Sequence, residues 1–141
     1  MATRGSYTAG MSLPDVLKQS LRGVAERDRD ICALYVFGSR IDGTARPDSD
    51  LDVGVLYGSR QSVEKNLVLE EALHRSTGMR VDLVDASRAT PYLALAVVRG
   101  DRIFARREVD ADLFDLYVLR RAGDLLPFER GRRALLLAPA T

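Results

Sequence analysis

The chain has little cysteine and no long apolar run, and both absences narrow its surroundings. It contains 141 residues with a single cysteine, so it cannot form an intramolecular disulfide, which fits a reducing compartment. Cys32 lies in an apolar segment, where we expect a buried and inert thiol. No apolar stretch approaches the ~20 residues of a membrane span, and residues 1–10 lack a signal peptide's apolar core. We therefore expect a cytoplasmic protein without a membrane partner.

The chain also lacks an excess of either charge. Its 21 basic and 20 acidic residues leave a net charge of +1, so no global attraction to nucleic acid or acidic membrane is expected. Nucleic acid is therefore not expected as a direct ligand. The 46% hydrophobic fraction suffices for one compact domain. We place this domain at residues 12–123, after a disordered extension at 1–11 and before a C-terminal segment at 124–141. Met11 is an alternative start to Met1.

Apolar periodicity predicts the secondary structure. Helices are predicted over residues 13–27, 62–77 and 91–99 and from Asp110 onward, and strands over residues 31–37, 51–57, 80–84 and 102–105. Ser12 and Thr90 are expected helix caps, and Gly78 is expected to end the second helix in the left-handed conformation. The order α-β-β-α-β-α-β-α predicts an α/β (α+β) fold. In it, a mixed β-sheet has helices packed on one face, and the other face stays open.

Two features leave more than one interpretation. Residues 124–141 are rich in apolar side chains, and they form either an amphipathic segment that docks on a partner or a helix folded back on the core. His74 lies on the polar side of the second helix without cysteine or histidine neighbours at ligand spacing. We interpret it as a surface residue.

A Gly-Ser pair follows the first predicted strand, and after ten intervening residues two aspartates stand at the start of the second strand. Gly38 lets the backbone approach a phosphate because it has no Cβ, and Ser39 adds a hydroxyl and an amide. Side chains in a strand alternate between its faces, so Asp50 and Asp52 share one face. Such close carboxylates repel each other unless a cation lies between them, and Mg²⁺ prefers oxygen ligands of this kind.

A third carboxylate lies in the next predicted strand. Asp82 would face the same layer as Asp50 and Asp52 if the two strands are neighbours, and the three would then form a two-metal site for displacement at phosphorus. Asp85 is a rival for the third position, although its place at the strand end favours a capping role. Ser49 is either a turn residue or a hydrogen-bond donor that orients Asp50.

Each of these signals is weak alone, and their combination is specific. A lone D-x-D pair is common on solvated strand edges, and turns favour glycine and serine. Here the spacing, the flanking strands and the later aspartate agree, so the sequence predicts a two-metal nucleotide site.

These motifs resemble a known family. Four segments carry the likeness: Phe37-Gly38-Ser39, Gly43-Thr44, Ser49-Asp50-Leu51-Asp52 and Val81-Asp82-Leu83-Val84-Asp85. They are similar to the signature of minimal nucleotidyltransferases of the polymerase-β superfamily, in particular the MNT antitoxins of prokaryotic HEPN–MNT toxin–antitoxin pairs. The likeness extends over roughly residues 31–117.

The resemblance implies a function and roles for individual residues. It implies an adenylyltransferase that moves AMP from ATP onto a tyrosine of a HEPN-domain ribonuclease toxin, in a hetero-oligomeric complex, and so silences the toxin. Asp50 and Asp52 would bind two Mg²⁺ ions and Asp82 the catalytic one. Gly38, Ser39 and Ser49 would bind the nucleotide.

Two other functions compete with this hypothesis. The chain could neutralise a toxin by binding alone, with a vestigial nucleotide pocket. It could also be a small-molecule nucleotidyltransferase of the aminoglycoside-modifying type, although such enzymes usually carry additional helical domains for the acceptor.

Overall fold

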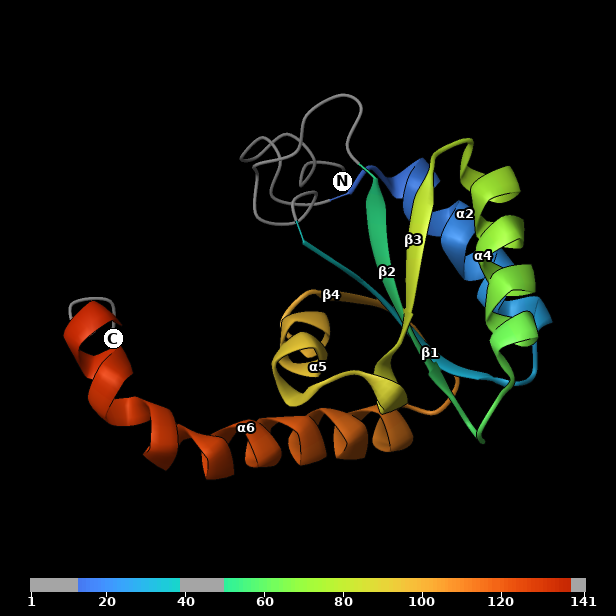
Figure 1. The fold of residues 1–141 in the computed structure, drawn as a ribbon. Coiled ribbons are helices and arrows are strands. Elements are labelled where there is room, and N and C mark those ends of the chain that lie inside the picture. Colours follow the sequence, from blue (N-terminus) through green and yellow to red (C-terminus); the bar gives the residue numbers. More distant parts are fainter. Residues whose placement is uncertain (1–12, 39–49, 138–141) are drawn as a thin grey trace.

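A computed structural model describes residues 13–38 and 50–137, and it places side chains as far as Gly123. The elements are α2 (Asp15–Arg27), β1 (Ile31–Phe37), β2 (Leu51–Tyr57), α4 (Val63–Thr77), β3 (Val81–Asp85), the short 3₁₀ helix η1 (Ala86–Arg88), α5 (Pro91–Val98), β4 (Asp101–Ala105) and α6 (Glu108–Leu137). Figure 1 shows them around one twisted sheet. The predicted order of helices and strands is confirmed.

The sheet is mixed, as predicted. Its strand order is β3-β2-β1-β4, with β1 antiparallel to both β2 and β4. β2 and β3 are parallel, because α4 carries the chain back to the starting edge between them. The parallel pair therefore begins at one end of the sheet, which is also the end where β1 finishes.

The helix ends follow local sequence signals. Ser62 Oγ accepts a hydrogen bond from Lys65 N at 3.1 Å, and Gly78 ends α4 with a φ of 71°. Thr90 Oγ1 accepts from Leu93 N at 3.2 Å, next to a proline at the first position of α5. Helix α2 begins after Pro14. The predicted cap Ser12 lies outside the described residues.

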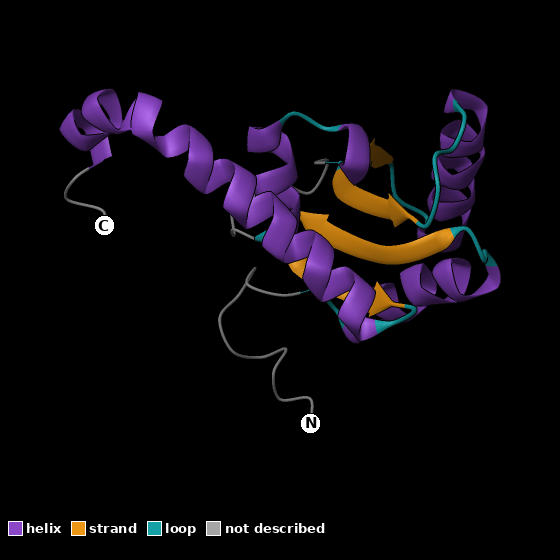
Figure 2. Cartoon of the chain, turned by 90° about the horizontal axis from the view of Figure 1, so that it is seen from below, coloured by secondary structure: helices purple, strands orange, loops and turns teal. Residues whose placement is uncertain are grey.

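Helices cover both faces of the sheet. On one face, α2 and α4 pack on a core that includes Leu34, Val53 and Leu73. On the opposite face, Tyr35 and Val97 belong to a second core under α5 and the first half of α6. The prediction of helices on one face only was therefore wrong, and Figure 2 shows α6 crossing the second face. Periodicity reveals that a helix has a buried side, but it does not reveal on which side of a sheet the helix lies.

Helix α6 has 30 residues and extends through most of the segment 124–141, for which the sequence left two interpretations. It begins at Glu108, so Asp110 lies in its first turn instead of capping it. Arg102 of β4 binds three α6 carboxylates at 2.8–3.0 Å, and this network fixes the helix start. Beyond Gly123 the helix continues and bends away from the sheet in Figure 1, which disfavours a segment folded back on the core. Pro127 gives a reason for a bend because it lacks the amide hydrogen that a helix needs.

Candidate active site

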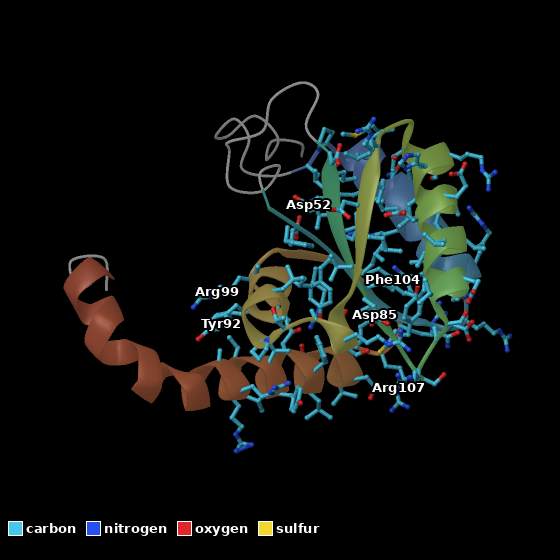
Figure 3. The ribbon with its side chains drawn as sticks, in the orientation of Figure 1. Asp52, Asp85, Tyr92, Arg99, Phe104 and Arg107 are labelled. Atoms are coloured by element: carbon cyan, nitrogen blue, oxygen red, sulfur yellow. The ribbon has the colours of Figure 1, made fainter. Side chains whose placement is uncertain are left out.

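Asp52 and Asp82 lie opposite each other on the parallel pair β2 and β3. Their neighbours Leu51, Val53 and Leu83 are buried in the core under α2 and α4. Because side chains alternate along a strand, both aspartates point to the other face. Figure 3 shows Asp52 at the end of this face that lies away from α5, and Asp82 is exposed.

Asp50 lies directly before β2, and its carboxylate approaches Arg80. Its Oδ1 lies 3.8 Å from Arg80 Nε, and both side chains are exposed. Within the described residues, no three histidine, cysteine, aspartate or glutamate side chains lie close enough together to hold one metal ion. The structure thus brings Asp52 and Asp82 together, while the three-carboxylate metal cluster stays a prediction.

The electrostatics of Asp52 indicate a place for a cation. Partial burial raises the pKa of the Asp52 carboxyl, and the negative charges of Asp82 and Asp50 raise that pKa further. A cation between these groups would relieve the repulsion. The donors are carboxylate oxygens, which are the ligands that Mg²⁺ prefers. The residues present therefore fit a magnesium site.

Gly38 closes the site from the end of β1. Phe37 pairs with Asp52 across the β1–β2 ladder, so the next residue lies beside the Asp52 side chain. Gly38 has a φ of 81°, and a Cβ added to it would collide with the Asp52 carboxylate. Both conditions require glycine here. The other predicted nucleotide-binding residues, Ser39 and Ser49, lie outside the described residues.

Asp85, the rival for the third carboxylate position, is engaged elsewhere. Its Oδ1 accepts hydrogen bonds from Ser87 N at 3.1 Å and Ser87 Oγ at 2.9 Å, and Arg88 lies 3.8 Å from its other oxygen. This is the capping role that its position indicated. The geometry therefore favours Asp82 over Asp85 as the partner of Asp52.

The sequence interpretation missed two residues near this site. Arg80 was not singled out, although its place two residues before Asp82 puts it on the same face of β3. His74 was interpreted as a surface residue, but it is half-buried and its Nδ1 accepts a hydrogen bond from Val81 N at 3.0 Å. Its spacing from Asn66 and Glu70 on the same helix was the available signal.

Cys32, which the sequence predicted to be buried, is only partly buried in the structure.

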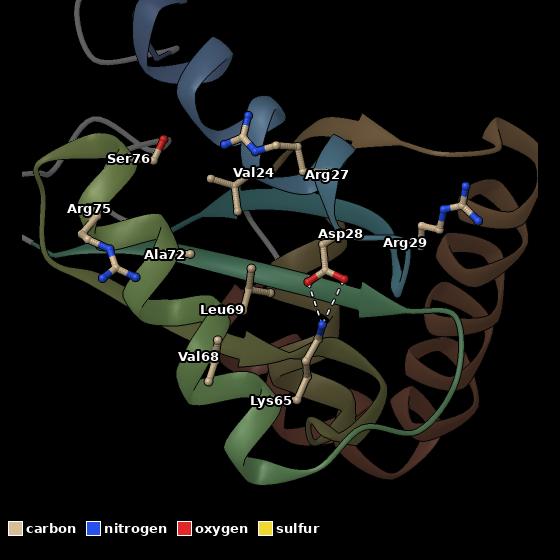
Figure 4. A pocket seen from close by; sticks show the side chains of 10 residues that line it. All are labelled: Val24, Arg27, Asp28, Arg29, Lys65, Val68, Leu69, Ala72, Arg75 and Ser76. Atoms are coloured by element: carbon tan, nitrogen blue, oxygen red, sulfur yellow. Dashed lines mark hydrogen bonds and ion pairs between the residues drawn. The ribbon is translucent and has the colours of Figure 1, made fainter.

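A separate groove of about 600 Å³ lies between α2 and α4, on the other side of the sheet from Asp52. Figure 4 shows apolar side chains at its base, with Arg27 and Arg75 at its margin. Lys65 reaches Asp28 at 2.8 Å, so this cation is already paired. The groove shares no residue with the carboxylate site.

Comparison with known proteins identifies the family of the chain. The family model described as "Polymerase beta, Nucleotidyltransferase" matches residues 19–109, which is more than half of the chain. The chain belongs to the polymerase-β nucleotidyltransferase family. The matched range includes Gly38, Asp52 and Asp82, so the candidate site lies within the family domain.

This nucleotidyltransferase is also similar in sequence or in fold to individual known proteins. It is 42% identical over 66 residues to the protein adenylyltransferase MntA of Thermococcus cleftensis, a match that covers 47% of this chain and 67% of that protein. The structure of a toxin–antitoxin with AMP-PNP contains a chain with a TM-score of 0.70 at 21% identity, covering 85% of this chain and 98% of that one. A tri-AMPylated Shewanella oneidensis HEPN toxin in complex with MNT antitoxin gives a TM-score of 0.67 at 18% identity, covering 87% and 98%. These two structures support the fold.

The described part of this nucleotidyltransferase has no helix that could span a membrane. None of its helices there combines the length and the apolar character that a membrane span requires.

Proposed function

We propose that the protein transfers AMP from ATP to a tyrosine of a cognate HEPN-domain toxin and thereby silences it, within a hetero-oligomeric complex in the cytoplasm. The observation that most supports this proposal is the pairing of Asp52 with Asp82, side by side on neighbouring strands, in a member of the nucleotidyltransferase family. The adenylyltransferase relative and the similarity to chains of toxin–antitoxin complexes support the choice of reaction and partner.

The reaction is an in-line displacement at the α-phosphorus of ATP. The tyrosine oxygen forms a new bond to this phosphorus, the bond to the β-phosphate oxygen breaks, and pyrophosphate leaves. In this proposal Asp82 would accept the phenolic proton, and its side chain is exposed. Two Mg²⁺ ions held by Asp50, Asp52 and Asp82 would neutralise the triphosphate and lower the pKa of the attacking hydroxyl.

The remaining residues position the nucleotide. Gly38 allows the chain to pass close to Asp52, so that a phosphate can lie beside both. Ser39 would donate to the triphosphate, and Ser49 would orient Asp50 or contact the nucleotide.

Intact-mass spectrometry of the purified toxin tests this proposal. Incubation with this protein, ATP and Mg²⁺ should add mass in whole AMP units, and Asp52→Asn should abolish the addition. Asp85→Asn is the matched control, because Asp85 lies on the same strand as Asp82 but caps η1. An Asp52→Asn protein that still adds AMP would refute this site.

Silencing by binding alone is a second candidate, and one observation favours it. Leu113, Leu116 and Tyr117 of α6 are 54–60% exposed, which offers an apolar surface to a partner. An Asp50→Ala, Asp52→Ala double variant separates the two functions. Continued protection of cells from the toxin by this variant would favour binding alone, whereas loss of protection with an intact complex would favour catalysis.

A further inference from the structure

The inference concerns the outer edge of β3, the strand that carries Asp82. Among the strands that the structure describes, β3 lies at the edge of the sheet, beside β2 only. Arg80 O accepts a hydrogen bond from Leu51 N at 2.8 Å, so the backbone of alternate residues of β3 faces β2. The amides of Val81 and Leu83 therefore point away from the sheet, where they need other partners.

Two side chains of α4 accept from these amides, and a third donates to an outward carbonyl of β3. His74 Nδ1 accepts from Val81 N at 3.0 Å, and Glu70 Oε2 accepts from Leu83 N at 2.9 Å. Asn66 Nδ2 donates to Leu83 O at 3.5 Å, a longer contact. We call Asn66, Glu70 and His74 the α4 ladder.

The ladder matches the geometry of the strand. Its members are four residues apart on the helix, which places them on one face about 6 Å apart along the axis. Residues two apart on a strand are separated by about 6.6 Å. One helix face can therefore satisfy successive outward backbone groups of β3, and the side chains must run antiparallel to the strand, as they do.

The ladder is itself anchored in the protein. Tyr57 Oη of β2 donates to Asn66 Oδ1 at 2.8 Å, which ties the first member to the strand that carries Asp52. The three ladder residues are half-buried. Since a backbone amide can only donate, His74 Nδ1 carries no proton in this arrangement.

The ladder residues bind the two neighbours of Asp82. Val81 and Leu83 are buried, with 3% and 7% of their surface exposed, and each has its outward amide held by α4. Asp82 between them is exposed. Its position relative to Asp52 depends on the register of β3 against β2, in which the two aspartates are direct partners.

We propose that the α4 ladder is a positioning device that holds Asp82 opposite Asp52 and so sets the affinity of this carboxylate pair for a divalent cation. This inference rests on the proposed function, in which Asp82 binds metal. A simple alternative is that the ladder only protects an edge strand from pairing with other chains. That role requires no change in metal affinity when the ladder is broken.

Mn²⁺ titration of the purified protein without nucleotide separates the two roles. Glu70→Leu and His74→Leu each remove one acceptor, and we expect the dissociation constant for Mn²⁺ to rise about tenfold, as for other residues that support metal ligands. Glu70→Gln and His74→Asn keep an acceptor oxygen, and they should bind Mn²⁺ like the wild type. Glu71→Leu is the matched control, because Glu71 contacts only Arg75, at 4.0 Å, among the bonds of the described residues.

Amide hydrogen exchange and AMP transfer complete the test. Exchange at Leu83 should quicken in Glu70→Leu, and AMP transfer should need about tenfold more Mg²⁺ while its maximal rate is retained. Unchanged Mn²⁺ affinity in a folded Glu70→Leu protein with faster exchange would overturn the proposal, and His74→Leu decides the matter if Glu70→Leu fails to fold. An Asp82→Asn protein that keeps both Mn²⁺ binding and AMP transfer would instead overturn the proposed function of the site.

Discussion

Replacing Gly38 by alanine should damage both stability and activity, for separable reasons. Gly38 has a φ of 81°, and a side chain in this left-handed region costs about 1–2 kcal/mol. For a domain of roughly 150 residues, each 1 kcal/mol lowers the melting temperature by about 2–4 °C. The added Cβ would also collide with the Asp52 carboxylate, so Asp52 must move. A displacement of about 1 Å in a catalytic group can cost about 100-fold in rate.

Gly78→Ala supplies the matched control for this experiment. Gly78 has a φ of 71°, but a Cβ there would meet nothing within 4 Å. We therefore expect a similar loss of about 1–2 kcal/mol with AMP transfer unchanged. Thermal unfolding and the rate of AMP transfer should be measured on both variants. Equal activity of Gly38→Ala and Gly78→Ala would refute the argument that close contact between Gly38 and Asp52 shapes the site.

Three further changes test the carboxylate pair and the core of the second face. Asp52→Asn should abolish AMP transfer yet stabilise the metal-free protein at neutral pH. Because the pKa of Asp52 is raised in the folded state, the stability of the wild type falls as pH rises through that pKa. Denaturation at several pH values should therefore show that the stability advantage of the variant disappears in acid. Tyr35→Phe removes a buried hydroxyl that donates to Asp115 Oδ1 at 2.5 Å, and urea denaturation should show a loss of about 1–3 kcal/mol. Gly54→Ala would force a Cβ against Val97 and should cost about 1–3 kcal/mol, and adding Val97→Ala should recover part of this loss, because the smaller side chain makes room.

Local signals in the sequence predicted the elements well. The strands β1 and β2 have the predicted bounds, because each is a short apolar run bounded by polar residues and turns. Gly78 and Thr90 ended and began helices as expected, because capping depends on chemistry within a few residues. Such features are local, so sequence alone can carry them.

Features that depend on distant contacts were not predictable in the same way. Asp110 looked like a cap, but α6 starts two residues earlier, where Arg102 of β4 pairs with Glu108 and also reaches Asp115 two turns further along the helix. The cover of the second face by α5 depends on the close approach of Val97 to Gly54, which no local pattern reveals. In both cases tertiary contacts decided between alternatives that the sequence left open.

The candidate site also contains one feature that the sequence predicted and one that it did not. The facing of Asp52 and Asp82 follows from strand alternation once β2 and β3 are neighbours. The α4 ladder was missed because its partners are backbone amide and carbonyl groups, which every residue carries whatever its side chain. Only the four-residue spacing of Asn66, Glu70 and His74 indicates a polar row along a helix that otherwise packs on the sheet.

The site therefore combines groups that repel with a backbone that resists the repulsion. Partial burial, and then the charges of Asp82 and Asp50, raise the pKa of Asp52, so its ionised form disfavours the metal-free fold. The parallel register of β2 and β3 opposes separation on the inner side, and the α4 ladder opposes it on the outer side. Gly38 permits the chain to leave β1 against Asp52 without displacing it. In the proposed function, a cation that enters between Asp52 and Asp82 would find these two carboxylates already side by side, so less of its binding energy would be lost in reorganising them.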